Sequence, residues 1–164
     1  MTAPDSVGLH IRVRGIVQGV GFRPFVYGLA VNNHLTGWVR NTSSGVEIEI
    51  SGTALNLQAF CQHLQNNPPP LARIDEILTE SVSPNGASTF EILDSQPQPG
   101  EFIPVSPDMA TCPDCRRELF DPSDRRYRYP FINCTNCGPR FTIIQDIPYD
   151  RPKTTMAPFA MCPE

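Results

Sequence analysis

Two C-x-x-C pairs constrain the second half of this 164-residue chain more than any other feature. Cys112 and Cys115 form the first pair, and Cys134 and Cys137 form the second after 18 intervening residues, 116–133. This spacing is typical of zinc sites in which each pair supplies two thiolates to one tetrahedral ion. Disulfide bonds and a redox-active pair are the alternatives. We expect metal, because the chain has no sign of secretion and disulfides are rare in the cytosol.

A zinc ion held by four cysteines has no open coordination position, so we expect it to be structural and not catalytic. Zinc would also explain how a proline-rich segment with little core can fold. The chain ends in Cys162-Pro163-Glu164, which repeats the start of the first C-x-x-C pair. We therefore expect residues 141–164 to be the start of a truncated second zinc-finger module, with Cys162 from its incomplete site. The spacing leaves open whether the four upstream cysteines share one ion or pair with downstream cysteines in an interleaved pattern.

The composition of the chain changes near residue 95. Residues 96–108 are rich in proline and lack periodicity, which predicts an extended linker. The linker would separate a first domain, residues 1–95, from a first zinc-finger module, residues 109–140. Hydrophobic residues make up 40% of the chain, which is enough for a real core and excludes wholesale disorder.

The first domain has the hydrophobic periodicity of an α+β fold. Spacing of three and four residues predicts helices around Phe22–Ala30 and Leu57–Leu64. Alternation of apolar and polar residues, with short apolar runs, predicts the strands Leu9–Val13, Trp38–Arg40, Val46–Ile50, Ile74–Val82 and Thr89–Leu93. The order is βαββαβ with a final short strand, the ferredoxin-like arrangement. Two helices would cover one face of an antiparallel sheet.

A glycine-rich loop, residues 15–21, joins the first strand to the first helix. Such a loop can point successive N–H groups at one anion, and the helix N-terminus adds its positive dipole end. Arg23 in the first turn could hold a phosphate with its guanidinium. The spacing alone leaves a simpler interpretation open, in which the glycines only let the chain bend.

The loop and a second stretch, Gly37–Gly45, resemble the two signature sequences of the acylphosphatase family, in the same order. The resemblance covers about residues 7–93. It implies that Arg23 and Asn41 are catalytic, with Arg23 holding the phosphate oxygens and Asn41 orienting the attacking water. It also implies that the phosphate-binding residues are Gln18, Gly19, Val20, Gly21, Phe22 and Arg23.

Acyl phosphates have a good carboxylate leaving group, so positioning and electrostatic stabilisation can suffice for their hydrolysis. We therefore expect no cofactor for this step.

The order of an acylphosphatase-like domain and C-x-x-C modules resembles the N-terminal part of the HypF family of carbamoyltransferases. Residues 129–140 are similar to the first zinc module of that family. The resemblance implies hydrolysis of carbamoyl phosphate as the first step of a pathway that passes the carbamoyl group to HypE and supplies the cyanide ligands of [NiFe]-hydrogenase. Full transferase activity is not expected of this chain.

Two other functions are alternatives: a catalytically silent zinc-binding scaffold and a stand-alone general acylphosphatase. The net charge of −4 argues against a nucleic-acid-binding protein, although residues 125–131 are basic and aromatic. No apolar run is long enough for a membrane span, and the N-terminus has no signal-peptide character, so we expect a cytoplasmic protein.

Overall fold

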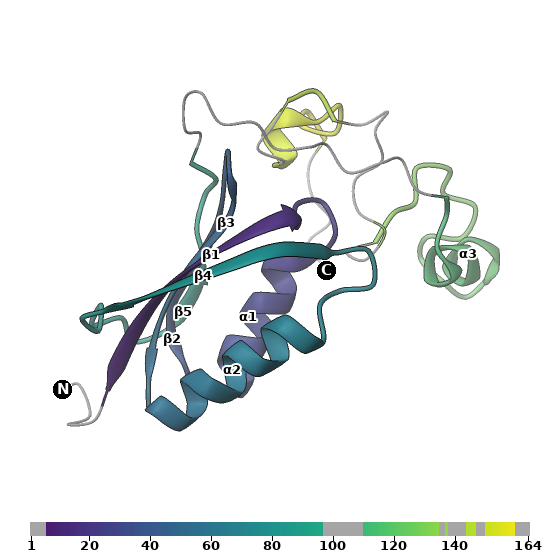
Figure 1. The fold of residues 1–164 in the computed structure, drawn as a ribbon. Helices are drawn as coiled ribbons and strands as arrows, with labels where there is room; N and C mark the ends of the chain where they lie inside the picture. The colour runs from purple at the N-terminus through teal and green to yellow at the C-terminus, as the bar shows by residue number, and fades with distance from the viewer. Residues whose placement is uncertain (1–5, 97–109, 135–136, 138–143, 147–149, 160–164) are drawn as a thin grey trace.

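The computed structural model describes residues 6–96, 110–134, 137, 144–146 and 150–159 (Figure 1). Apart from Gln96, the predicted linker at residues 96–108 lies outside the described residues, and so does Cys162. The four cysteines of the first zinc-finger module, hereafter the finger cysteines, are all described.

The observed elements confirm the predicted ferredoxin-like order, with most strands and helices longer than their sequence patterns indicated. The order is β1 (Val7–Ile16), α1 (Phe22–Asn32), β2 (Thr36–Thr42), β3 (Gly45–Gly52), α2 (Ala54–Asn66), β4 (Arg73–Val82) and β5 (Phe90–Ile92). A short helix, α3 (Pro113–Phe120), and a 3₁₀ turn, η2 (Arg151–Lys153), follow in the second half.

The strands form one sheet in the order β4-β1-β3-β2-β5. The expectation of a wholly antiparallel sheet was wrong at one edge, because β5 pairs with β2 in parallel. The chain leaves β4 at one edge of the sheet and must cross to the other edge before β5 can pair. The pattern of a three-residue strand does not reveal which neighbour it takes or in which direction.

Both long helices cover the same face of the sheet, as Figure 1 shows. Their apolar faces meet alternate residues of the central strands, which is the period-2 pattern expected of a half-buried sheet. Fully buried side chains at the centre of this core include Ile11, Val26, Val39, Ile48 and Phe60.

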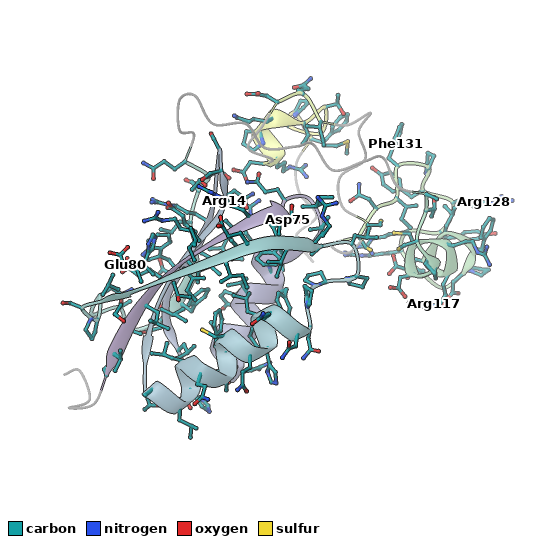
Figure 2. All side chains as sticks on the ribbon, viewed as in Figure 1. Arg14, Asp75, Glu80, Arg117, Arg128 and Phe131 are labelled. Atoms are coloured by element: carbon teal, nitrogen blue, oxygen red, sulfur yellow. The ribbon has the colours of Figure 1, made fainter. Side chains whose placement is uncertain are left out.

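The opposite face of the sheet carries cross-strand charge pairs. Arg14 lies beside Glu76 with a nitrogen–oxygen distance of 3.1 Å, and Arg40 lies beside Glu47 at 2.8 Å. Figure 2 shows Arg14 and Glu80 on this sheet, far from Arg117 and Arg128 near α3. Opposite charges therefore alternate across the face and largely neutralise one another.

A second, smaller core surrounds the finger cysteines. Cys115, Ile132 and Cys137 are buried there, and Leu119 packs against them. Leu71, in the loop between α2 and β4, packs against both this cluster and the main core. The finger is therefore in contact with the first domain at this loop.

Candidate functional site

The loop between β1 and α1 has the backbone conformation that its glycines permit. Gly19 and Gly21 have φ angles of 71° and 75°, in the left-handed region that glycine adopts at little cost. Gly21 is the N-cap of α1, no side chain caps this helix start, and its first turn contains no acidic residue. The N–H groups and dipole of this helix end are therefore not neutralised by a carboxylate of its own first turn.

Apolar side chains anchor the same loop. Val17, Val20 and Phe22 are each at most 3% exposed and belong to the main core. Their burial fixes the loop against the sheet, so the polar backbone between them is held in one shape. A fixed shape is what a backbone anion site requires, because the N–H groups must converge before the anion arrives.

Arg23 lies in the first turn of α1, beside this loop. Its side chain is 17% exposed, and its Nη1 lies 2.9 Å from Oδ1 of Asp150. The guanidinium is thus held close to the helix N-terminus by a carboxylate from a distant part of the chain. The sequence analysis missed Asp150, because nothing in the local pattern around residue 150 indicates a partner in α1.

Asn41 lies near the end of β2 and is 1% exposed. It pairs with Val46 of β3, and Val46 pairs in turn with Val13 near the end of β1. The β2–β3 hairpin therefore ends next to the glycine-rich loop.

Gln18 joins the loop to this hairpin directly. Its Nε2 donates hydrogen bonds to the carbonyl oxygens of Thr42 and Gly45, each at 2.8 Å. Both donors of the side-chain amide are used in these two bonds, so any contact of Gln18 with a phosphate would fall to its backbone N–H. The residues that the sequence analysis assigned to catalysis and phosphate binding thus lie on connected parts of the fold.

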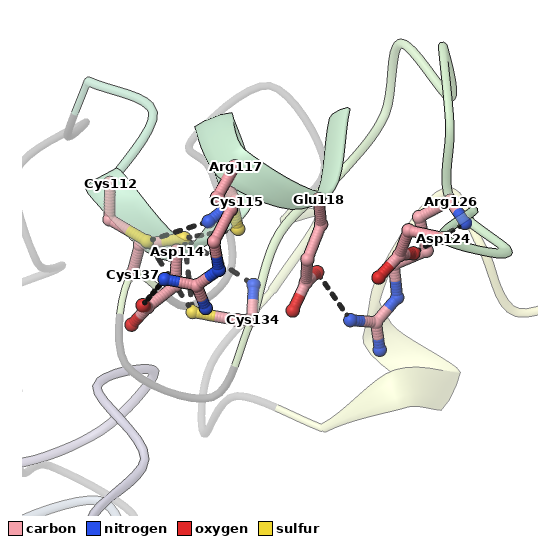
Figure 3. A network of polar contacts seen from close by, with 9 residues as sticks. All are labelled: Cys112, Asp114, Cys115, Arg117, Glu118, Asp124, Arg126, Cys134 and Cys137. Atoms are coloured by element: carbon pink, nitrogen blue, oxygen red, sulfur yellow. Dashed lines mark hydrogen bonds and ion pairs between the residues drawn. The ribbon is translucent and has the colours of Figure 1, made fainter. Parts of the chain in front are cut away.

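The four finger cysteines come together in one cluster, shown in Figure 3. All four Sγ atoms lie within 4.8 Å of one another, with Cys112–Cys134 and Cys115–Cys137 separations of 3.6 Å. A tetrahedral zinc ion with Zn–S bonds of about 2.3 Å sets sulfur–sulfur separations of about 3.8 Å. Four soft thiolate donors at this spacing fit zinc, and they fit one shared ion without needing cysteines from downstream.

Burial raises the pKa of the Cys115 thiol, and contacts with the other three cysteines raise it further. Burial also acts to raise the pKa of Cys112, but hydrogen bonds from Cys115 and the neighbouring thiols outweigh burial and lower this pKa overall. A bound cation would favour the thiolate form of all four cysteines.

The basic and aromatic stretch after α3 is engaged in local contacts. Arg126 pairs with Glu118 of α3 at 2.6 Å, and the guanidinium of Arg128 lies over the ring of Tyr127 (Figure 3 shows the first pair). Tyr129 packs edge-on against Phe131. These contacts support the finger itself. Among the residues that the structure describes, no helix has the length and apolar character needed to cross a membrane.

Comparison with known proteins gives two family matches. Residues 9–92 match the acylphosphatase family, and residues 111–144 match the family described as HypF finger. The chain is 36% identical to an acylphosphatase of Oceanobacillus iheyensis over 86 residues, which cover 51% of this chain and 94% of that protein.

Longer relatives match nearly the whole chain. The chain is 52% identical to carbamoyltransferase HypF2 of Cupriavidus necator over 161 residues, covering 97% of this chain and 20% of that protein. A crystal structure of full-length HypF in the phosphate- and nucleotide-bound form is similar with a TM-score of 0.92 and 54% identity, covering 98% of this chain and 21% of that one. The chain therefore spans about a fifth of the length of these relatives.

Proposed function

The chain belongs to the acylphosphatase family, and we propose that it hydrolyses acyl phosphates, with carbamoyl phosphate as the substrate. Similarity to HypF carbamoyltransferases supports this choice of substrate. In this proposal, hydrolysis is the first step of a HypF-type reaction that carries the carbamoyl group to HypE and supplies the cyanide ligands of [NiFe]-hydrogenase.

One observation carries the proposal. Arg23 lies in the first turn of α1, directly after a loop in which Gly19 and Gly21 have left-handed backbone conformations. A dianionic phosphate at this helix end would receive backbone N–H groups, the helix dipole and a guanidinium together. These groups recognise the phosphate part of an acyl phosphate.

The reaction proposed for this site is direct attack of water on phosphorus. Asn41 orients the water, its oxygen forms the new bond to phosphorus, and the bond between phosphorus and the acyl oxygen breaks. The electron pair leaves with the carboxylate or carbamate, which is stable as an anion and needs no general acid, and the protons of the water stay with the inorganic phosphate that forms. Arg23 stabilises the charge that spreads over the phosphoryl oxygens in the transition state.

The second half of the chain is proposed to bind one structural zinc ion through Cys112, Cys115, Cys134 and Cys137. Zinc would supply a cross-link between α3 and the segment that contains the second pair. The buried core around the cysteines is small, so this cross-link would contribute most of the stability of the finger.

Phosphate release from carbamoyl phosphate and from acetyl phosphate tests the proposed activity. We expect Arg23→Ala to lower kcat by at least about 10²-fold, the scale for losing one group that stabilises transition-state charge. Arg12→Ala is the matched control, because Arg12 is half exposed on the far side of the sheet, beside Glu80. Turnover by folded Arg23→Ala at the wild-type rate would contradict the proposal, and the rate ratio of the two substrates measures carbamoyl selectivity.

A further inference from the structure

Asp150 contacts the arginine that is central to the proposed phosphate site. The separation of Oδ1 from Nη1 of Arg23 is 2.9 Å, and the two side chains are only 28% and 17% exposed. Partial burial reduces the screening of an ion pair by water, so this pair is held more firmly than a surface pair. The carboxylate comes from beyond the acylphosphatase match, which ends at residue 92.

The segment that carries Asp150 is held by contacts of its own. Ile144 and Thr154 form a β-bridge, and the N–H of Gln145 donates to the carbonyl oxygen of Lys153 at 2.9 Å. Thr154 is 3% exposed. Asp150 is therefore presented from a folded segment. Figure 1 shows η2 of this segment near the end of the sheet at which β1 stops.

The carboxylate of Asp150 does not make the local hydrogen bond that its position in the chain favours. Asp150 is the N-cap of η2, a position at which aspartate commonly accepts a hydrogen bond from the following backbone. No such side-chain bond is present, and the carboxylate points to Arg23 instead. The contact with Arg23 of α1 therefore takes the place of the local capping bond.

We propose that Asp150 is a positioning residue for the acyl-phosphate site, holding the guanidinium of Arg23 in the orientation that binds the phosphoryl group. This inference rests on the proposed function. The guanidinium is a rigid planar group, so a carboxylate held at Nη1 fixes the direction in which its other N–H donors point.

The opposite role, a carboxylate that competes with phosphate for Arg23, predicts the opposite sign. Removal of a competitor strengthens phosphate binding and raises kcat/KM. Removal of a positioning residue lowers kcat, because Arg23 is then misplaced in the transition state, while ground-state attraction for the dianion persists. The backbone contacts between residues 144–145 and residues 153–154 restrain the position of Asp150, and this favours the positioning role.

The test compares Asp150→Ala, Asp150→Asn and wild type in the full chain, with carbamoyl phosphate and acetyl phosphate as substrates. We expect kcat to fall about tenfold in Asp150→Ala with KM changed by less than about threefold. Asp150→Asn keeps an oxygen acceptor at the same place and should recover part of the loss. Asp146→Ala is the control, because Asp146 belongs to the same segment but pairs with Lys153 at 2.9 Å.

A second readout does not depend on turnover. Nuclear magnetic resonance of the Arg23 side chain should show a well-ordered Nε–H group in the wild type and a mobile one in Asp150→Ala. An unchanged Arg23 signal, an unchanged kcat, or a higher kcat/KM in folded Asp150→Ala would overturn the inference. A wild-type chain without phosphate release would instead overturn the proposed function, and the Arg23 signal would still decide the role of Asp150.

Discussion

A single glutamine amide connects the two signature stretches of the site. Gln18 bonds to Thr42 and Gly45, the residues that flank the turn after Asn41. The Gln18 side chain thus connects the loop that would hold the phosphate to the hairpin that would hold the water. Its role is one of position, since both amide donors are directed at backbone carbonyls.

We predict that Gln18→Ala lowers stability and activity together. The substitution leaves two partly buried carbonyls without their donors, at a cost of about 1–3 kcal/mol. Asn41 would lose its fixed relation to the loop, so kcat should fall more than KM rises. Urea unfolding and phosphate release measure the two effects. Gln58→Ala, at an exposed position of α2, should change neither stability nor activity. Equal effects of the two variants would refute a connecting role for Gln18.

Residues for the proposed sites can be identified from the sequence where the signal is local. Arg23 and the glycines stand within one short stretch, and the spacing of the cysteines follows from the geometry of a tetrahedral ion. Asp150 could not be predicted in this way. Its contact with Arg23 depends on how the end of the chain packs over the first domain, which no local periodicity encodes.

At the scale of elements, two glycines show how differently the same residue type can matter. Gly45, at the start of β3, has a φ of 144°, and a Cβ there would collide with the carbonyl oxygen of Val13. Gly28, within α1, has nothing within 4 Å of a Cβ. The first glycine is required by the close approach of β1 and β3, whereas the second only weakens its helix.

We predict that Gly45→Ala destabilises the chain by about 2 kcal/mol or more, because it combines a strained backbone with a backbone collision. Gly28→Ala should stabilise it by about 0.5–1 kcal/mol through the helix propensity of alanine. Thermal or urea unfolding of both variants checks the pair. Similar changes of the same sign would show that the hairpin and β1 are less tightly packed than their register indicates.

Elements with strong periodicity were predictable because burial imposes the same pattern on sequence and structure. The sequences of β1 and β3 alternate between apolar and polar residues from Leu9 to Arg14 and from Val46 to Ser51, and both helices follow their apolar stripes. β5 is different, since three residues cannot specify a partner or a direction. Its parallel pairing with β2 follows from tertiary packing, in which Phe90 enters the main core.

At the scale of the whole molecule, the finger should depend on its metal, and the metal on pH. In the metal-free chain burial raises the pKa of Cys115, so this ligand is a protonated thiol at neutral pH and zinc must displace the proton. We predict one zinc per chain and an affinity that falls as the pH is lowered from about 8 to about 6. Metal analysis measures the zinc content, and a chelator titration at each pH measures the affinity. Cys115→Ser should lose the metal, whereas Cys61→Ser, in the other core, should keep it.

The finger also bears on the proposed active site through the segment that carries Asp150. A cavity of about 230 Å³ is lined by Tyr129 and Ile132 of the finger and by Arg151 and Thr154 of that segment, which places the two in contact. If zinc orders the finger, it also supports the segment, and through Asp150 it supports the orientation of Arg23.

We therefore predict that removing zinc with a chelator lowers kcat for acyl phosphates about as much as Asp150→Ala does, while the first domain stays folded. The two changes act on the same link, so they should not add: chelation should have little further effect on Asp150→Ala. Circular dichroism monitors the first domain, and phosphate release gives kcat for the four combinations. Wild-type activity that survives full zinc removal, or a chelation effect of equal size in Asp150→Ala, would mean that the finger and the site act independently.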